Sequence, residues 1–79
     1  MINILFFGPV AERVGASRLV VDYYPGMCVQ DVQARLQEQH PAAFELVFLV
    51  AVDGAHVRDM SVVLADNSEV VFMSKFSGG

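Results

Sequence analysis

The chain opens with Ile2-Asn3-Ile4-Leu5-Phe6-Phe7, an almost continuous apolar run that is closed by Gly8-Pro9. A short apolar run that ends at Gly and Pro is typical of a β-strand. Alternate residues of a strand share a face, so one face carries Ile2, Ile4 and Phe6 and the other carries Leu5 and Phe7. Because both faces are apolar, we expect this strand to lie in the middle of a sheet.

Outward from this strand, the sequence predicts further strands at residues 17–24, 48–52 and 69–73. Turn signals separate these segments, namely Pro25-Gly26, Asp53-Gly54 and Asp66-Asn67-Ser68. Residues 9–14 are expected to form one or two helical turns that stop at Gly15. Residues 62–64 fit either a short fourth strand or a 3₁₀ turn, and the sequence leaves both open.

One main helix is predicted over residues 28–40, where Val29, Val32 and Leu36 recur at helical spacing. Asp31 lies in its first turn, where a negative charge favours the helix dipole, and Pro41 ends it. The apolar stripe is narrow, so this helix covers one face of the sheet and leaves the other face uncovered. Strands and one helix in this order predict an α+β fold, with the first and last strands side by side in the middle.

The composition limits both the architecture and the partners. The 79 residues suffice for one domain, which we place at residues 1–74, followed by a tail at residues 75–79. With 54% hydrophobic residues the chain is too apolar for disorder, and part of its surface is expected to face a partner. A net charge of −4 with scattered basic residues argues against nucleic-acid binding. We also expect no membrane span and no signal peptide.

Few residues outside the tail carry a chemical signal. Cys28 is the only cysteine, which excludes an internal disulfide and fits a reducing, cytoplasmic setting. A thiol at the start of a helix can be activated, but no cation lies near it in sequence, and we interpret Cys28 as structural. We interpret His40 and His56 as surface residues. No spacing indicates a metal site, a bound cofactor or a catalytic group.

The tail, which ends in Gly78-Gly79, is the exception. Gly lacks a Cβ, so a Gly-Gly end can enter a channel that is too narrow for other residues. From Lys75 onward an extended chain reaches roughly 17 Å from the fold, which is enough to deliver a carboxylate into another enzyme's active site. A carboxylate is a poor electrophile and must first be activated, for instance as an acyl-adenylate. The tail therefore predicts a partner enzyme that uses a nucleotide.

With the tail placed, the whole chain resembles the small subunit of molybdopterin synthase and the wider group of ubiquitin-like sulfur carriers. The matching stretches run from end to end, and they are Leu5-Phe6-Phe7-Gly8 with Glu12 and Gly15, Val29-Gln30-Asp31-Val32, Leu49-Val50-Ala51-Val52, and Asp66-Asn67-Ser68-Glu69-Val70-Val71-Phe72 before Gly78-Gly79. The resemblance implies a β-grasp, or ubiquitin-like, fold in which one main helix crosses one face of a mixed sheet.

The resemblance also implies a role for the tail. An adenylating activating enzyme would use ATP to adenylate Gly79, which would then become a thiocarboxylate with sulfur from a donor enzyme. Gly78 would pass through the channel of the large synthase subunit, which transfers the sulfur to the pterin precursor. Phe7, Val57 and Met73 would form the apolar docking surface, with Phe76 beside them in the tail. The chain would bind no cofactor and would have no catalytic site of its own.

Two departures from the family pattern keep the acceptor pathway open. Ser74-Lys75-Phe76 stands where the family usually has a Pro-Pro pair, and Asp66-Asn67-Ser68-Glu69 replaces an Asp-Gly-Asp-Glu turn. Both leave sulfur carriage intact. The alternatives are a carrier for thiamin thiazole, cysteine or another thio-metabolite, a ubiquitin-like modifier that is joined to lysines, and a binding module with an incidental Gly-Gly.

Overall fold

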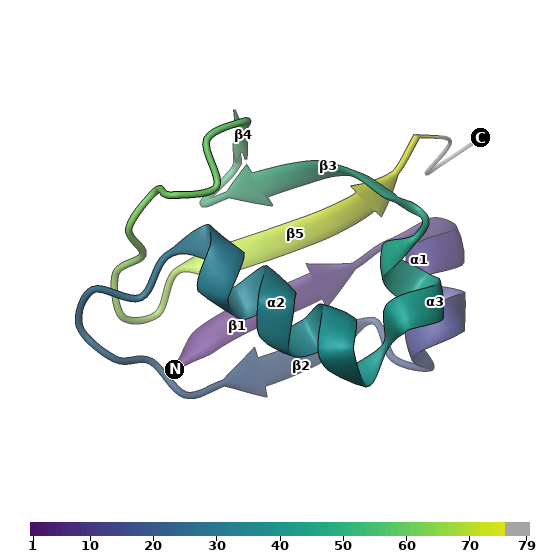
Figure 1. The fold of residues 1–79 in the computed structure, drawn as a ribbon, viewed down its shortest axis with the longest axis horizontal. Helices are drawn as coiled ribbons and strands as arrows, with labels where there is room; N and C mark the ends of the chain where they lie inside the picture. The colour runs from purple at the N-terminus through teal and green to yellow at the C-terminus, as the bar shows by residue number, and fades with distance from the viewer. Residues whose placement is uncertain (76–79) are drawn as a thin grey trace.

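A computed structural model describes residues 1–75 of the chain. Five strands and three helices follow one another in the order β1 (Ile2–Phe6), α1 (Gly8–Val14), β2 (Arg18–Val21), α2 (Val29–Gln39), α3 (Pro41–Phe44), β3 (Val47–Val52), β4 (Ala55–Val57) and β5 (Glu69–Ser74). Figure 1 shows α2 crossing the sheet, with α1 and α3 packed together at one end.

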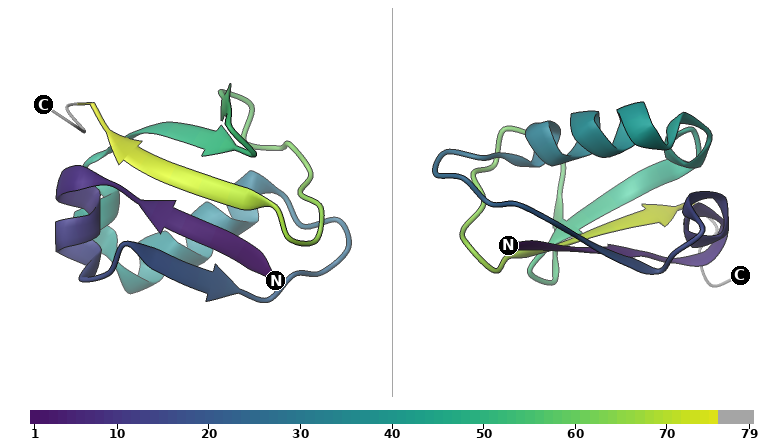
Figure 2. Two further views of the ribbon diagram at one scale, coloured as in Figure 1. Left: turned by 180° about the vertical axis from the view of Figure 1, so that it is seen from behind. Right: turned by 90° about the horizontal axis from the view of Figure 1, so that it is seen from below.

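The strands form one mixed sheet in the order β2-β1-β5-β3-β4. The first and last strands, β1 and β5, lie side by side and run parallel, while the other neighbours are antiparallel. The prediction that these two strands occupy the middle of the sheet is therefore confirmed. Figure 2 shows α2 and α3 on one side of the sheet and the opposite side without a helix. We call this uncovered side the open face.

The core lies between the sheet and α2. Ile2, Ile4 and Phe6 of β1 are fully buried there, as the alternation in the sequence predicts. The helix contributes its narrow stripe of Val29, Val32 and Leu36, which is also buried. Complete burial of a large apolar side chain contributes roughly 1.5–3 kcal/mol, so these few side chains account for much of the stability of a small domain.

A short third helix completes the core at one end. Pro41 ends α2, as predicted, but it also begins α3, because proline is well tolerated in a first helical turn. The helix buries Phe44, whose ring lies 5.0 Å from that of Phe72 and 6.4 Å from that of Phe6. A helix of four residues is too short to show a period, and for this reason the sequence did not reveal it.

The fourth strand lies earlier in the chain than residues 62–64. Strand β4 pairs with β3 across a turn in which Asp53 and Gly54 both have positive φ. This is the backbone that a tight two-residue hairpin requires, and Asp-Gly is well suited to it. Within residues 62–64, Val63 forms only an isolated bridge with Cys28. Asp53-Gly54, which closes the strand predicted at residues 48–52, is therefore also the turn of a hairpin.

Candidate functional site

The candidate site begins where the tail leaves the sheet. Strand β5 ends at Ser74, which lies opposite Val47 at the start of β3. On the other side of β5, Phe72 pairs with Phe6, the last residue of β1. Phe7, which follows Phe6, therefore lies near the end of β5. The predicted site residues Phe76, Gly78 and Gly79 lie outside the described residues. What the structure describes is the surface from which they continue.

The open face next to this exit is apolar. Strand register places Leu5 beside Val71, and Leu49 beside Met73, on the side of the sheet away from α2. Leu5, Leu49 and Met73 are partly exposed there. Phe7 follows β1 in extended conformation and is 48% exposed. The sequence placed Phe7 and Met73 on an uncovered patch, and the structure leaves both side chains partly accessible to a partner.

Val57 lies elsewhere. It pairs with Val50, whose side chain is buried in the core, and Val57 itself packs against that core. Its neighbour His56 pairs with Ala51 and therefore faces the open side. The structure thus brings Phe7 and Met73 to one face but turns Val57 to the other, because a shift of one residue along a strand reverses the face. Leu49 and His56 join the open face instead, and recognition of the Asp53-Gly54 hairpin would have identified them.

Comparison with protein families supplies the assignment. The model of the ThiS family matches residues 4–79, which is nearly the whole chain. The chain belongs to the ThiS family. The resemblance to ubiquitin-like sulfur carriers noted in the sequence is thereby confirmed. A comparison with curated protein sequences found no match.

Several solved structures share the fold of this ThiS-family chain. The small archaeal modifier protein SAMP1 of Haloferax volcanii is 24% identical, with a TM-score of 0.83 over 99% of this chain and 98% of the other. A putative molybdopterin converting factor subunit 1 from Pyrococcus furiosus is 19% identical, with a TM-score of 0.81 over 92% and 94%. A solved complex of subunits 1 and 2 of the molybdopterin-converting factor from Helicobacter pylori contains a chain that is 19% identical. The TM-score is 0.72 over 99% of this chain and 97% of the other. These likenesses establish the β-grasp fold.

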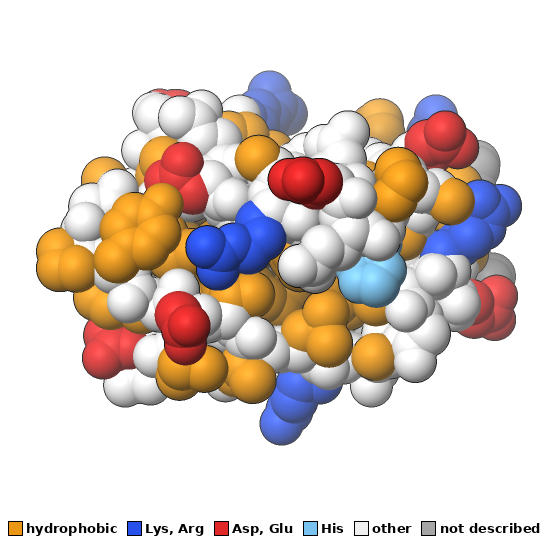
Figure 3. All heavy atoms as spheres, turned by 60° about the horizontal axis from the view of Figure 1, so that its bottom comes forward, with side chains coloured by type: hydrophobic (Ala, Val, Ile, Leu, Met, Phe, Trp, Pro, Cys, Tyr) orange, Lys and Arg blue, Asp and Glu red, His pale blue; other side chains and the backbone are white. Residues whose placement is uncertain are grey.

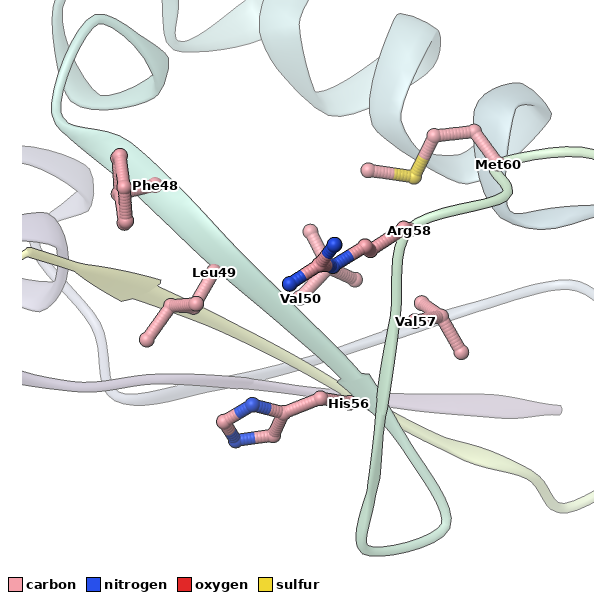
Figure 4. Close-up of a pocket in the computed structure, with 7 residues that line it drawn as sticks. All are labelled: Phe48, Leu49, Val50, His56, Val57, Arg58 and Met60. Carbon is pink, nitrogen blue, oxygen red and sulfur yellow. The ribbon is translucent and has the colours of Figure 1, made fainter.

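A hollow of about 600 Å³ adjoins the tail exit of this ThiS-family domain on the side of β3 and β4. Its lining consists of Phe48, Leu49, Val50, His56, Val57, Arg58 and Met60. Figure 4 shows the guanidinium of Arg58 reaching across Val50 toward Leu49, with Phe48 and Met60 at opposite ends. The ammonium of Lys75, the last described residue, lies 5.6 Å from the centre of the Phe48 ring. The hollow and the tail base are therefore neighbours.

Cys28 is held as a neutral thiol. It is the N-cap residue directly before α2. Its sulfur donates a hydrogen bond to the Asp31 carboxylate at 3.0 Å, and its backbone N–H donates to the same oxygen at 2.9 Å. The hydrogen bond to Asp31, together with partial burial, raises the pKa of the Cys28 thiol above its ordinary value. A thiol with a raised pKa is a poor nucleophile, so the geometry supports the structural interpretation of Cys28.

Charged groups show no other arrangement that points to chemistry. Among residues 1–75, no group of three or more His, Cys, Asp or Glu side chains is placed to hold a metal ion. No helix of the described part of the chain is long and apolar enough to cross a membrane. On the face shown in Figure 3, Lys and Arg side chains stand apart and form no continuous basic patch. The features that stand out are the apolar open face, the hollow and the tail exit between them.

Proposed function

We propose that this chain is a sulfur carrier that works through the carboxylate of Gly79. The carboxylate oxygen attacks the α-phosphorus of ATP on an activating enzyme and displaces pyrophosphate, which leaves an acyl-adenylate. A hydrosulfide ion released by a donor enzyme then attacks the acyl carbon and displaces AMP, which carries away the bonding electron pair, and the resulting thioacid loses its proton. The product is a thiocarboxylate at Gly79. ATP is therefore a substrate of the partner enzyme and is not held by this domain.

One observation carries the proposal. A tail that ends in Gly78-Gly79 continues from β5 at the border of an apolar, partly exposed face in a chain of the ThiS family. A partner that grips Phe7 and Met73 holds the base of the tail at the same time. Docking and delivery of the carboxylate are thereby coupled, and Gly78 can thread the narrow entrance of the partner's site.

We further propose that the sulfur acceptor pathway is molybdopterin synthesis, with this chain as the small synthase subunit. In this proposal the large subunit docks on Phe7, Met73 and Phe76, and Leu49 and His56 extend the contact. Val57 contributes through the adjoining hollow rather than through the open face. The likeness to molybdopterin converting factor subunit 1 supports the shape of the domain that such a subunit needs. A single cysteine, Cys28, is compatible with a cytoplasmic location.

The test is the intact mass of the chain after incubation with an adenylating enzyme of this type, ATP and a sulfur donor. A mass gain equal to the replacement of one oxygen by one sulfur, mapped to the C-terminal peptide, is expected. Omission of ATP is the control and must prevent the gain. If the tail is modified only by attachment to lysines of other proteins, the chain is a protein modifier instead. If a thiocarboxylate forms but the large synthase subunit does not accept its sulfur, another thio-metabolite is the product.

A further inference from the structure

The edge of the sheet beside the tail exit is only half covered. Strand β4 pairs with β3 at Val50, Ala51 and Val52. Within residues 1–75, no strand lies beside the preceding part of β3, residues 47–49, on the side away from β5. Unpaired backbone groups on a strand edge can accept an added strand.

Apolar side chains flank this free edge. Phe48 is 64% exposed, which is unusual for an aromatic ring in a strand. It forms one end of the hollow, and Met60 forms the other. Between them, Leu49 and Val57 are partly exposed. An extended segment that paired with residues 47–49 would place alternate side chains into the hollow.

One formally charged side chain, that of Arg58, lines the hollow. Arg58 reaches over the hollow, and within the described residues its side chain makes no hydrogen bond or ion pair. Asp59 keeps its negative charge, but its carboxylate accepts hydrogen bonds from the backbone and the hydroxyl of Ser61 and forms no ion pair with Arg58. The Arg58 guanidinium, which has no ion-pair partner among the described residues, therefore favours an occupant that carries a carboxylate.

We propose that residues 47–49 and the hollow form a second docking site, which binds an extended segment of a partner protein with apolar residues followed by acidic ones. The segment adds to β3 as a strand, its apolar side chains contact Phe48 and Leu49, and a carboxylate pairs with Arg58. This site shares Leu49, His56 and Val57 with the contact proposed for the large synthase subunit, but Phe7, Met73 and the carboxylate of Gly79 take no part in it. The two proposals can therefore fail separately.

The test is a titration of the ¹⁵N-labelled chain, followed by NMR, with an acetylated and amidated peptide Val-Leu-Val-Asp-Glu-Asp. We expect saturable shifts at Phe48, Leu49 and Arg58, and slower hydrogen exchange at an amide within residues 47–49. The matched peptide Val-Leu-Val-Asn-Gln-Asn is expected to bind about tenfold more weakly. Equal binding of the two peptides, or shifts that avoid the hollow, would overturn the proposal.

Variants separate the site from general electrostatics. Arg58→Glu is expected to weaken binding of the acidic peptide about tenfold or more, whereas Arg35→Glu, the same charge change on exposed α2, is expected to change it by less than about twofold. Phe48→Ala is expected to weaken the binding of both peptides. Phe7→Ala must leave peptide binding unchanged, because Phe7 does not line the hollow. A denaturant melt of each variant checks that the fold is intact. An equal loss of affinity for the acidic peptide in Arg58→Glu and Arg35→Glu would contradict the assignment of the site to the hollow.

Discussion

Phe6 and Phe7 are consecutive in the chain, yet they face opposite sides of the sheet. Phe6 is fully buried, and its ring stacks on Phe72 with the centroids 6.0 Å apart. Phe7 is 48% exposed directly after β1, near the point where the chain leaves β5 toward the tail. The two positions therefore offer the same substitution once in the core and once on the proposed docking surface.

Alanine at these two positions is expected to have opposite consequences. Phe6→Ala removes a ring from the centre of the core and should cost about 3–5 kcal/mol of unfolding free energy. Phe7→Ala should cost the isolated domain comparatively little, but it should weaken binding to the large synthase subunit or to the activating enzyme more than tenfold, or about 1.4 kcal/mol. A denaturant melt and a binding titration on both variants provide the check. If Phe7→Ala unfolds the domain, the assignment of faces on β1 is inverted.

Removal of Gly79 is expected to abolish sulfur loading and leave the fold unchanged. The core of the described residues runs from Ile2 to Phe72, so the loss of one terminal residue should leave the melting temperature unchanged. Gly78→Val should act in the same way, since a branched side chain clashes with a channel shaped for glycine. Intact mass after incubation with the activating enzyme, ATP and a sulfur donor measures loading. Normal loading of a chain that lacks Gly79 would remove the central claim.

The thiol of Cys28 is expected to react slowly with iodoacetamide near neutral pH. Its hydrogen bond to Asp31 raises the pKa of the thiol, so little thiolate is present. Asp31→Asn should lower that pKa and speed the alkylation. Cys28→Ser should leave sulfur transfer unchanged and can stabilise α2 by about 0.5–1 kcal/mol, because serine is a better N-cap. Loss of transfer in a folded Cys28→Ser variant would show that the thiol takes part.

Acid is expected to destabilise the domain partly through Asp31. Hydrogen bonds from the backbone and then the sulfur of Cys28 lower the pKa of this carboxyl below its ordinary value of 3.8. The folded state therefore binds a proton less readily than the unfolded state, so this contribution is present above pH ~4 and is lost as the pH falls through the folded pKa.

Denaturant melts between pH 7 and pH 2 measure this contribution. Asp31→Asn should lower stability at neutral pH and flatten the pH dependence in the acid range. Asp22→Asn, which changes an exposed carboxylate just after β2, is the matched control. Identical pH profiles for Asp31→Asn and the unmodified chain would contradict the role of the Cys28–Asp31 hydrogen bonds.

The β-grasp arrangement came from the resemblance to a known family, whereas the residue pattern by itself determined an α+β sheet, the central place of the first and last strands, and the main helix. Each of these rests on a repeating pattern of apolar residues over several positions, as in Ile2, Ile4 and Phe6, and such patterns report burial directly. The Gly78-Gly79 tail was also visible, because its signal is its composition. Short elements lack such repetition, and α3 and β4 were missed for that reason.

The tertiary structure alone decided which side chains share a face. Met73 lies in β5 and Phe7 directly after β1, whereas Val57 and His56 belong to a hairpin whose register depends on a turn of two residues. A shift of one residue in the register of β4 decides whether Val57 or His56 lies on the open face. Segments that are far apart in the chain also meet at the half-covered edge of β3. Arg58 lines the hollow there, and Lys75 lies over the ring of Phe48. Contacts of this kind arise from strand pairing across the sheet, and no local pattern of residues encodes them.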